Sequence, residues 1–360
     1  MNNKTGLFLG FFVAVCSLTA CDSELKQALK QGQTPYNFVR PVGFPAPILP
    51  ANNPLTDEGV ELGRHLFYDT QLSRNNTQSC ASCHALNNAL TDSRQFSVGI
   101  DGIAGHRNAM PIFNLAWSNS PFFWDGRAKN LQEQALMPIQ DPIEMHETLP
   151  NVVAKLTDDR KYELMFAKAF SNSKITPENI AKALEQFMLT IVSGNSKYDK
   201  YLRGEASLTT SEANGKSLFD KEFKSTASGL KGGGDCFHCH GNVFFTTNRF
   251  TNNGLDSVFT DGGRGMVTGL PQDQGKFKTP TLRNIELSAP YMHDGRFATL
   301  RETIDFYNFH QKSSNTIDPV IKSVGEGLRF TNLDVTDMVN FLKTLTDTSF
   351  TNNPRYKSPF

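Results

Sequence analysis

Two cysteine-containing pentads constrain this chain more than any other feature of its sequence. They read Cys80-Ala81-Ser82-Cys83-His84 and Cys236-Phe237-His238-Cys239-His240, so both have the form C-x-x-C-H. Two thiols at this spacing can bond to the two vinyl groups at one edge of a haem, and the histidine that follows then lies under the iron as its proximal ligand. The pentads therefore predict two covalent c-type haems, with His84 and His240 as iron ligands.

Paired cysteines also serve zinc and thiol redox chemistry. The four pentad cysteines can in principle form one all-thiolate zinc site, whereas a thioredoxin-like site would need a strand-helix-strand context that is missing here. A histidine follows both pairs, and this favours haem over either alternative. The remaining cysteines are Cys16 and Cys21 at the amino terminus, where Cys16 is expected to leave with a signal peptide and Cys21 to carry a lipid. If the other four cysteines hold haem, no pair is left for a structural disulfide.

The amino terminus has the pattern of an export signal. Lys4 precedes an apolar run over residues 7–15, and Leu18-Thr19-Ala20 places small residues before Cys21. The run is too short to span a bilayer. We predict a lipoprotein signal peptide over residues 1–21 that ends at a lipidated Cys21, and the alternative is an ordinary cleaved signal in which Cys21 is incidental. The mature protein is expected in the periplasm, tethered to the membrane only by its lipid.

Composition limits the partners and the number of domains. Lysine and arginine total 36, and so do aspartate and glutamate. This balance provides no global field to attract nucleic acid, so we expect no nucleic-acid partner. At 360 residues the chain is too long for one ordinary core, and two domains are expected.

The two halves of the chain share one plan. Gly63-Arg64-His65-Leu66-Phe67 precedes the first pentad, and Gly215-Lys216-Ser217-Leu218-Phe219 precedes the second. Downstream, Trp124-Asp125-Gly126-Arg127 recurs as His293-Asp294-Gly295-Arg296. The repeat predicts an internal duplication and a mainly α fold of two cytochrome c-like haem domains. After an N-terminal extension at residues 22–50, these domains are expected at residues 51–195 and 196–360.

Capping residues predict where several helices begin. Thr56 and Thr209 can cap the helices that enter the two G-x-x-L-F motifs, the second with Glu212 in a capping box. Thr176-Pro177-Glu178 opens an apolar-periodic run to Val192, and another run extends from residue 335 to 345.

The segments between these helices are expected to be irregular. Residues 229–234 and 252–275 are rich in loop-forming residues, and residues 193–208 are the expected join between the two domains. A small β-hairpin is expected near residues 243–247.

Taken together, these motifs resemble the bacterial di-haem cytochrome c peroxidases, a family that also includes the MauG enzymes of methylamine utilisation, which oxidise tryptophans of a partner protein. The resemblance covers nearly all of the mature chain. It is carried by the following runs: Leu62-Gly63-Arg64-His65-Leu66-Phe67-Tyr68-Asp69, Ser79-Cys80-Ala81-Ser82-Cys83-His84, Phe123-Trp124-Asp125-Gly126-Arg127, Lys278-Thr279-Pro280-Thr281-Leu282-Arg283-Asn284 and Ala289-Pro290-Tyr291-Met292-His293-Asp294-Gly295.

The resemblance implies a role for several residues. The first haem becomes the peroxide site and the second the electron-transfer site, with Trp124 between them. Gln134 and Glu144 match the catalytic residues on the distal side of the first haem, and Asn108 matches a residue that helps to hold a calcium ion between the domains. From the residues alone, Trp124 can equally be a core tryptophan, Glu144 a surface carboxylate and Gln134 a solvated helix residue.

Two departures from the usual family pattern bear on iron ligation. Where many members have a histidine that blocks the first haem, this chain has Ile100, so the resemblance implies an open sixth site unless His106 substitutes. Opposite the second haem, Tyr307 matches the tyrosine of the MauG-like members, and Met292 and His293 are the competing ligands. By the offset within the repeat, Tyr307 corresponds to Pro138 in the first half, which cannot bind iron.

Three functions follow from this pattern. The first is a cytochrome c peroxidase that reduces hydrogen peroxide with electrons from a small exported cytochrome or cupredoxin. The second is a MauG-like oxidase that modifies aromatic residues of a partner protein, and the third is a non-catalytic electron carrier. Family members are often dimers, so a homodimer is a further expectation. His65, His146, His238 and His310 are interpreted as ordinary histidines without a functional role.

Overall fold

The protein is described by a computed structural model that covers residues 23–30, 32–170, 174–228 and 232–360. The predicted signal peptide and the lipidated Cys21 lie outside these residues. Within them the chain is mainly helical, and its strands form one two-stranded antiparallel sheet. No helix of this described part is long and apolar enough to cross a membrane.

The helices and strands are short and are separated by long turns. Helices α2 to α6 span Asp57–Tyr68, Leu131–Gln140, Leu149–Thr157, Arg160–Ala169 and Pro177–Thr190. Helices α7 to α10 span Lys197–Leu202, Thr210–Asp220, Phe237–His240 and Arg264–Thr268, and α11 to α13 span Leu300–Asp305, Asn332–Lys343 and Thr348–Asn352. Strand β1 (Phe250–Thr251) pairs with β2 (Phe277–Lys278), with Phe250 opposite Lys278.

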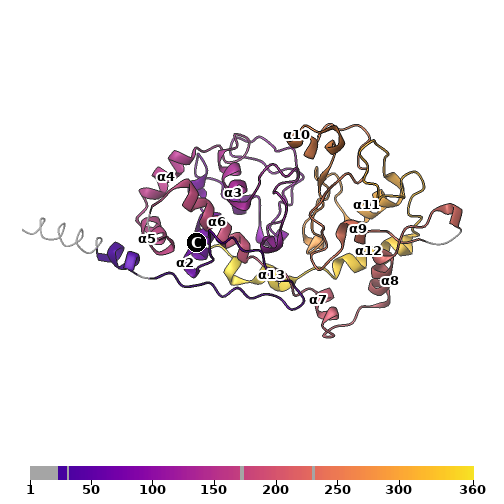
Figure 1. Ribbon diagram of the computed structural model, residues 1–360, viewed down its shortest axis with the longest axis horizontal. Coiled ribbons are helices and arrows are strands. Elements are labelled where there is room, and N and C mark those ends of the chain that lie inside the picture. The colour runs from indigo at the N-terminus through magenta and orange to yellow at the C-terminus, as the bar shows by residue number, and fades with distance from the viewer. Residues whose placement is uncertain (1–22, 31, 171–173, 229–231) are drawn as a thin grey trace, which may run out of the picture.

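The elements gather into two lobes, each with its own hydrophobic cluster (Figure 1). The first lobe contains α2 to α6, and the second contains α8 to α12. We use "first lobe" and "second lobe" in this sense below. Since apolar side chains in each lobe are removed from water mainly against one another, each lobe has a core of its own.

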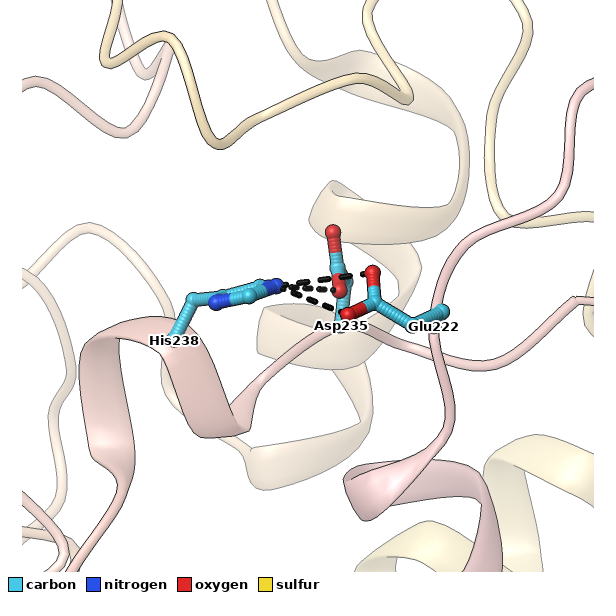
Figure 2. Close-up of side chains that lie close together, drawn as sticks. All are labelled: Glu222, Asp235 and His238. Atoms are coloured by element: carbon cyan, nitrogen blue, oxygen red, sulfur yellow. Dashed lines mark hydrogen bonds and ion pairs between the residues drawn. The ribbon is translucent and has the colours of Figure 1, made fainter.

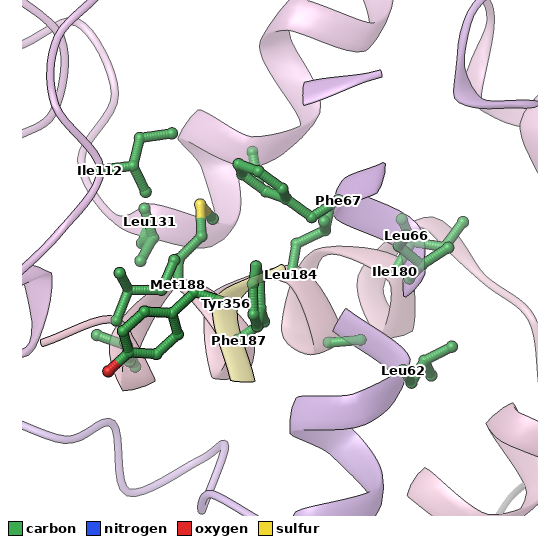
Figure 3. Close-up of a cluster of buried hydrophobic side chains, with 14 of the residues drawn as sticks. Leu62, Leu66, Phe67, Ile112, Leu131, Ile180, Leu184, Phe187, Met188 and Tyr356 are labelled. Atoms are coloured by element: carbon green, nitrogen blue, oxygen red, sulfur yellow. The ribbon is translucent and has the colours of Figure 1, made fainter. Parts of the chain in front are cut away.

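Helices α2 and α6 pack closely in the core of the first lobe (Figure 3). Gly63 makes this possible, because a Cβ there would overlap the carbonyl oxygen of Ala183 and lie 2.8 Å from the Cβ of Phe187. The rings of Phe67 and Phe187 then meet with their centroids 5.4 Å apart. Leu62, Leu66, Ile180 and Leu184 are buried around them.

Helices α8 and α12 repeat this arrangement in the second lobe. A Cβ on Gly215 would overlap the carbonyl oxygen of Asp337 and lie 2.8 Å from the Cβ of Phe341. The rings of Phe219 and Phe341 meet with their centroids 5.3 Å apart. The two G-x-x-L-F motifs thus build the same helix contact in each lobe. The glycine allows the backbone of the partner helix to approach, and the phenylalanine of the motif packs on a phenylalanine ring of that helix.

Both ends of the described chain pack on the first lobe. Phe44, from the segment that precedes α2, is buried in its cluster, and so are Phe350 and Tyr356 near the carboxyl terminus. The Tyr356 hydroxyl donates to the carbonyl oxygen of Thr190 at the end of α6. The chain therefore crosses back from the second lobe to the first after α12 (Figure 1).

The helix starts predicted from capping residues are confirmed. The side chains of Thr56, Thr176 and Thr209 each accept a hydrogen bond from the first turn of their helix, and Glu212 completes a capping box with Thr209. These caps satisfy backbone N–H groups that the helix itself leaves unpaired. The run at residues 335–345 forms α12, which begins earlier, at Asn332.

Two predictions about irregular segments are wrong. Residues 243–247 form turns and no hairpin, because Phe245 adopts a left-handed backbone conformation, with φ +52°, that a strand does not accept. The stretch 252–275 is not entirely loop, since it contains α10 and a short 3-10 turn at Pro271–Asp273. Helix α7 lies within the expected join at residues 193–208.

Candidate haem sites

The first pentad lies on a 3-10 turn at Cys80–Ser82, and its histidine has a fixed tautomer. Nδ1 of His84 lies 2.8 Å from the carbonyl oxygen of Leu90. Because a carbonyl oxygen can only accept, Nδ1 carries the proton, and the lone pair of Nε2 is left for a metal. Burial lowers the pKa of His84, so the imidazole is neutral, as a metal ligand must be.

The second pentad is arranged in the same way on α9. Nδ1 of His240 lies 3.0 Å from the carbonyl oxygen of Phe245, and this again leaves the lone pair of Nε2 for a metal. Burial lowers the pKa of His240 to about 4. Both pentad histidines are thus oriented by a backbone carbonyl a few residues downstream, and both present a neutral nitrogen.

The four pentad cysteines are free thiols. They do not come together as the ligands of one metal ion, because the cluster of three close metal-ligand side chains among the described residues contains no cysteine. The all-thiolate zinc alternative is therefore wrong. Each pair instead lies on its own turn, with the spacing that thioether attachment needs.

A large cavity opens beside the first pentad. Its volume is about 940 Å³, near the upper end of the ~300–1,000 Å³ of ligand pockets. Cys80, Cys83 and His84 line it, and so do three residues that the sequence assigned to the distal side: Gln134, Pro138 and Glu144. The fold thus brings α3 and the turn that follows it over the cavity that the first pentad lines.

Glu144 has an altered acidity in this cavity. Burial, together with the nearby Asp141 carboxylate, raises the pKa of Glu144 to about 7, although Arg127 opposes the shift. The backbone N–H of Ile100 donates to the Glu144 carbonyl oxygen at 2.9 Å. The Ile100 segment therefore lies against the Glu144 turn, and the side chain at position 100 offers no ligand atom. His106 also lines the cavity, although its side chain is largely exposed.

Two of the three candidate ligands for the second haem converge on one amide. Nδ2 of Asn253 donates to the Tyr307 hydroxyl at 3.1 Å and lies 3.5 Å from the Met292 sulfur. Tyr307 lies in a π-helical turn, Phe306–His310, that continues α11. Burial raises the pKa of Tyr307, and the two cysteines of the second pentad are close enough to contribute. π-turns of this kind are frequent at functional sites.

The third candidate, His293, faces different neighbours. Its ring stacks on Phe277 with the centroids 3.7 Å apart, and it lines the cavity of the first pentad. Asp261, Asp294 and Arg107 act on its pKa, which burial lowers. The structure thus separates His293 from the pair formed by Tyr307 and Met292 around Asn253.

Trp124 lies where the two lobes meet. Its side chain is 8% exposed, and its indole N–H donates to the carbonyl oxygen of Asn108 at 2.8 Å. Its own carbonyl oxygen accepts from the backbone N–H of Lys278, on β2, at 2.7 Å. Trp124 therefore connects the turn of Asn108 to a strand from the second half of the chain.

Asn108 is buried at the same junction. Its backbone N–H donates to the carbonyl oxygen of His293 at 2.7 Å. Its side-chain amide lies 3.2 Å from the carbonyl oxygens of Arg94 and Gln95. Carbonyl and amide oxygens are the donor types that calcium takes, and the predicted calcium site at Asn108 stays a prediction.

Comparison with known proteins gives the same family from three directions. The family model "Di-haem cytochrome c peroxidase" matches residues 57–207. Methylamine utilization protein MauG of Methylophilus methylotrophus is 32% identical over 309 residues, which cover 86% of this chain and 87% of that protein. Cytochrome c551 peroxidase of Nitrosomonas europaea is 36% identical over 323 residues, or 87% of this chain and 86% of that protein. The chain belongs to the di-haem cytochrome c peroxidase family.

A solved structure supports the assignment. A MauG-like protein associated with microbial copper homeostasis superposes with a TM-score of 0.80 at 35% identity, over 90% of this chain and 99% of that one. Relatives of this family member include both MauG proteins and cytochrome c peroxidases. Family membership implies two c-type haems. The residues present fit them, because each pentad combines free thiols with a neutral imidazole whose Nε2 is available.

Sequence reasoning missed several residues of these sites. Lys278 is 6% exposed, and no ion-pair partner is found for it among the described residues. Burial lowers the pKa of its amine to about 8, and it lines the first cavity. Asn253 and Arg107 were also missed. Lys278 begins one of the runs that carry the family resemblance, but no local pattern assigned a role to its amine, and nothing local in the sequence marked Asn253.

Proposed function

We propose that this protein is a cytochrome c peroxidase that reduces hydrogen peroxide to water with electrons from a small exported redox protein. One observation carries the proposal. Glu144, with its pKa raised to about 7, lines the same cavity as the first pentad, and position 100 beside it is isoleucine. A titratable carboxyl in the cavity of an open haem can serve the proton transfers of peroxide reduction.

Each residue of the first cavity has a separate role in the proposed peroxide reduction. When bound, the haem supplies the iron that takes the peroxide and the electrons that break its O–O bond. Glu144 takes a proton from the attacking peroxide oxygen and returns it to the departing one. Gln134 orients the peroxide from α3, one turn from Pro138, which closes the distal side without offering a ligand. Lys278 is available to pair with a haem propionate.

Trp124 is proposed as the route for the second electron. Its position at the junction of the lobes, with hydrogen bonds to the turn of Asn108 and to β2, supports this role. The ring then lies in the path between the two haems. Calcium at Asn108 would stabilise this junction.

The recurrence of one geometry in both lobes supports an internal duplication. In each lobe a glycine admits a partner helix, and a carbonyl orients the pentad histidine. We propose two cytochrome c-like haem domains, peroxidatic at residues 51–195 and electron-transferring at 196–360, with the extension at 22–50 and the last residues packed on the first. Lipidation of Cys21 would tether the protein in the periplasm, and a homodimer is the proposed assembly.

A MauG-like oxidation of aromatic residues on a partner protein is the second candidate. The position of Tyr307 favours it, since a tyrosine ligand lowers the potential of the second haem relative to methionine. Among the comparisons, the MauG proteins and the MauG-like structure support this reading as much as the peroxidases support the first.

Two measurements on the holoprotein distinguish these functions. We expect steady-state peroxide consumption when a reduced small cytochrome c is supplied, and an untreated ferric protein with a high-spin signal from the first haem. A protein that is wholly low-spin and consumes no peroxide would be an electron carrier, contrary to the proposal. Peroxide titration without a donor separates the enzymes, because a long-lived oxidised form shared by both haems would favour protein oxidation.

A further inference from the structure

A side-chain cluster beside the second pentad has the composition of a small metal centre. Glu222, Asp235 and His238 each offer one ligand atom, and these atoms all lie within 4.8 Å of one another (Figure 2). Glu222 follows α8, Asp235 precedes the second pentad, and His238 is the third residue of that pentad. Among the described residues, these three form the one group of at least three histidine, cysteine or carboxylate side chains whose ligand atoms lie this close together.

One imidazole nitrogen faces two carboxylates in this cluster. Nε2 of His238 lies 3.1 Å from Oδ1 of Asp235, and 3.3 Å and 3.4 Å from the two oxygens of Glu222. Figure 2 shows the three side chains converging from α9, from the turn that precedes it and from the segment after α8. The geometry gathers three donors of the types that bind transition metals.

Asp235 provides an independent observation. Its side chain is only 10% exposed, and both of its carboxylate oxygens are buried without a well-formed hydrogen bond, although Nε2 of His238 lies 3.1 Å from Oδ1. Burying a carboxylate in this way is unfavourable unless a cation or donors compensate it. The nearby Glu222 carboxylate adds like charge and makes the need for a cation greater. A cation bound between the three side chains would therefore stabilise the buried carboxylate of Asp235.

We propose that Glu222, Asp235 and His238 bind one divalent transition-metal ion. The imidazole favours a transition metal over calcium or magnesium, which take oxygen ligands. Zinc(II) suits the set, since it binds imidazole nitrogen and carboxylate oxygen, and three protein ligands leave a position for water. The ion ties the end of α8 to the turn that carries the second haem. His238 thereby gains a role that the sequence did not assign to it.

Zinc titration of the holoprotein tests the site. After chelator treatment, calorimetric titration with zinc chloride at pH 7 is expected to show one equivalent bound. Loss of an outer-shell partner alone weakens metal binding by about 10–100-fold, so Asp235→Asn and His238→Gln are each expected to weaken it by at least about tenfold. His146→Gln is the matched control, because His146 pairs with a single carboxylate, Asp101, at 2.6 Å. It should leave the zinc affinity unchanged.

A second readout separates loss of metal binding from loss of folding. Zinc should raise the thermal midpoint of the wild-type holoprotein and leave that of Asp235→Asn where it is, since a ligand stabilises only the state that binds it. If Asp235→Asn does not fold, Glu222→Gln serves instead, because the Glu222 side chain is half exposed. Absence of saturable zinc binding, or binding that survives all three variants, would overturn the proposal.

Discussion

Glu144 shows how a single side chain acquires its chemistry from its surroundings. A glutamate in water is ionised at neutral pH, whereas burial and the Asp141 carboxylate bring the pKa of Glu144 to about 7. At this value both protonation states are well populated near neutral pH. A group of this kind can accept a proton from one peroxide oxygen and deliver it to the other.

Glu144→Gln is expected to slow peroxide-dependent turnover by about 10²–10⁴-fold, the usual contribution of a positioned acid–base group. In the wild type, the rate of reaction with peroxide should rise with pH through about pH 7, because the ionised carboxyl is the base. The variant should lack this rise. Stopped-flow kinetics from pH 5.5 to 8.5 measures both. Glu163→Gln is the control, because this side chain lies on the solvent-facing side of α5 and is 38% exposed. An unchanged pH profile in Glu144→Gln would refute the role of Glu144.

Tyr307→Phe is expected to change the absorption spectrum of the second haem and to leave that of the first unaltered. It removes the candidate ligand oxygen and the hydrogen bond from Asn253, which contributes about 1 kcal/mol to the free energy of unfolding. Tyr291→Phe is a matched control in the same lobe, since that hydroxyl donates to a backbone carbonyl. If Met292→Leu changes the spectrum and Tyr307→Phe does not, methionine is the ligand.

At the scale of elements, close contact between two helices positions each pentad. Gly63 on α2 and Gly215 on α8 admit the backbones of α6 and α12, so the helix that leads into each pentad is held against a core helix. A methyl group has no room at either glycine, because it would meet backbone atoms that cannot rotate away.

Gly63→Ala and Gly215→Ala should each lower the free energy of unfolding by about 1–3 kcal/mol through overpacking. The loss should be local, so that the first variant weakens the first lobe and the second variant the second. Urea unfolding followed by hydrogen exchange of each lobe measures this. Gly32→Ala is the control, because no atom lies within 4 Å of its Cβ position. Stability equal to that of the control variant would mean that the helices separate easily.

At the scale of the whole molecule, charged side chains hold the lobes together. Arg107 of the first lobe donates to both oxygens of Asp261 at 2.7 Å and 2.8 Å, and to Asp125 at 2.6 Å. Arg264 reaches back to the carbonyl oxygens of Asp125 and Gly126. Because Asn108 and Trp124 belong to the same junction, its geometry would also set the route that we propose through Trp124.

Arg107→Gln is expected to lower the free energy of unfolding by about 3–5 kcal/mol, since it leaves the partly buried Asp261 carboxylate without its cation, whereas Asp125 keeps Arg127. It should also slow electron transfer between the haems. Denaturant unfolding and flash-induced electron transfer test the two effects. Arg74→Gln, which breaks an exposed pair with Asp101, should change stability by no more than about 1 kcal/mol. An Arg107→Gln protein as stable as that control would show that the junction does not depend on this cation.

Features that depend on short spacing along the chain could be predicted from the sequence alone. The spacing of the thiols and the histidine within each pentad and the threonine caps involve residues within about one or two helical turns, so local geometry alone specifies them. The G-x-x-L-F motifs marked one side of each helix contact, whereas the partner residues on α6 and α12 lie far along the chain. The family resemblance added Glu144, Gln134 and Trp124, whose placement around the first cavity and the junction is consistent with that expectation.

Contacts between segments that are distant along the chain, and the burial that they cause, became visible only in the folded structure. The fold brought Asn253 to Tyr307 and Met292, separated His293 from them, and raised the pKa of Glu144 by burial. It also placed Glu222 beside Asp235 and His238, a proximity that no local pattern predicts. Desolvation and long-range contacts arise only when the chain is folded, and for this reason no spacing in the sequence encodes them.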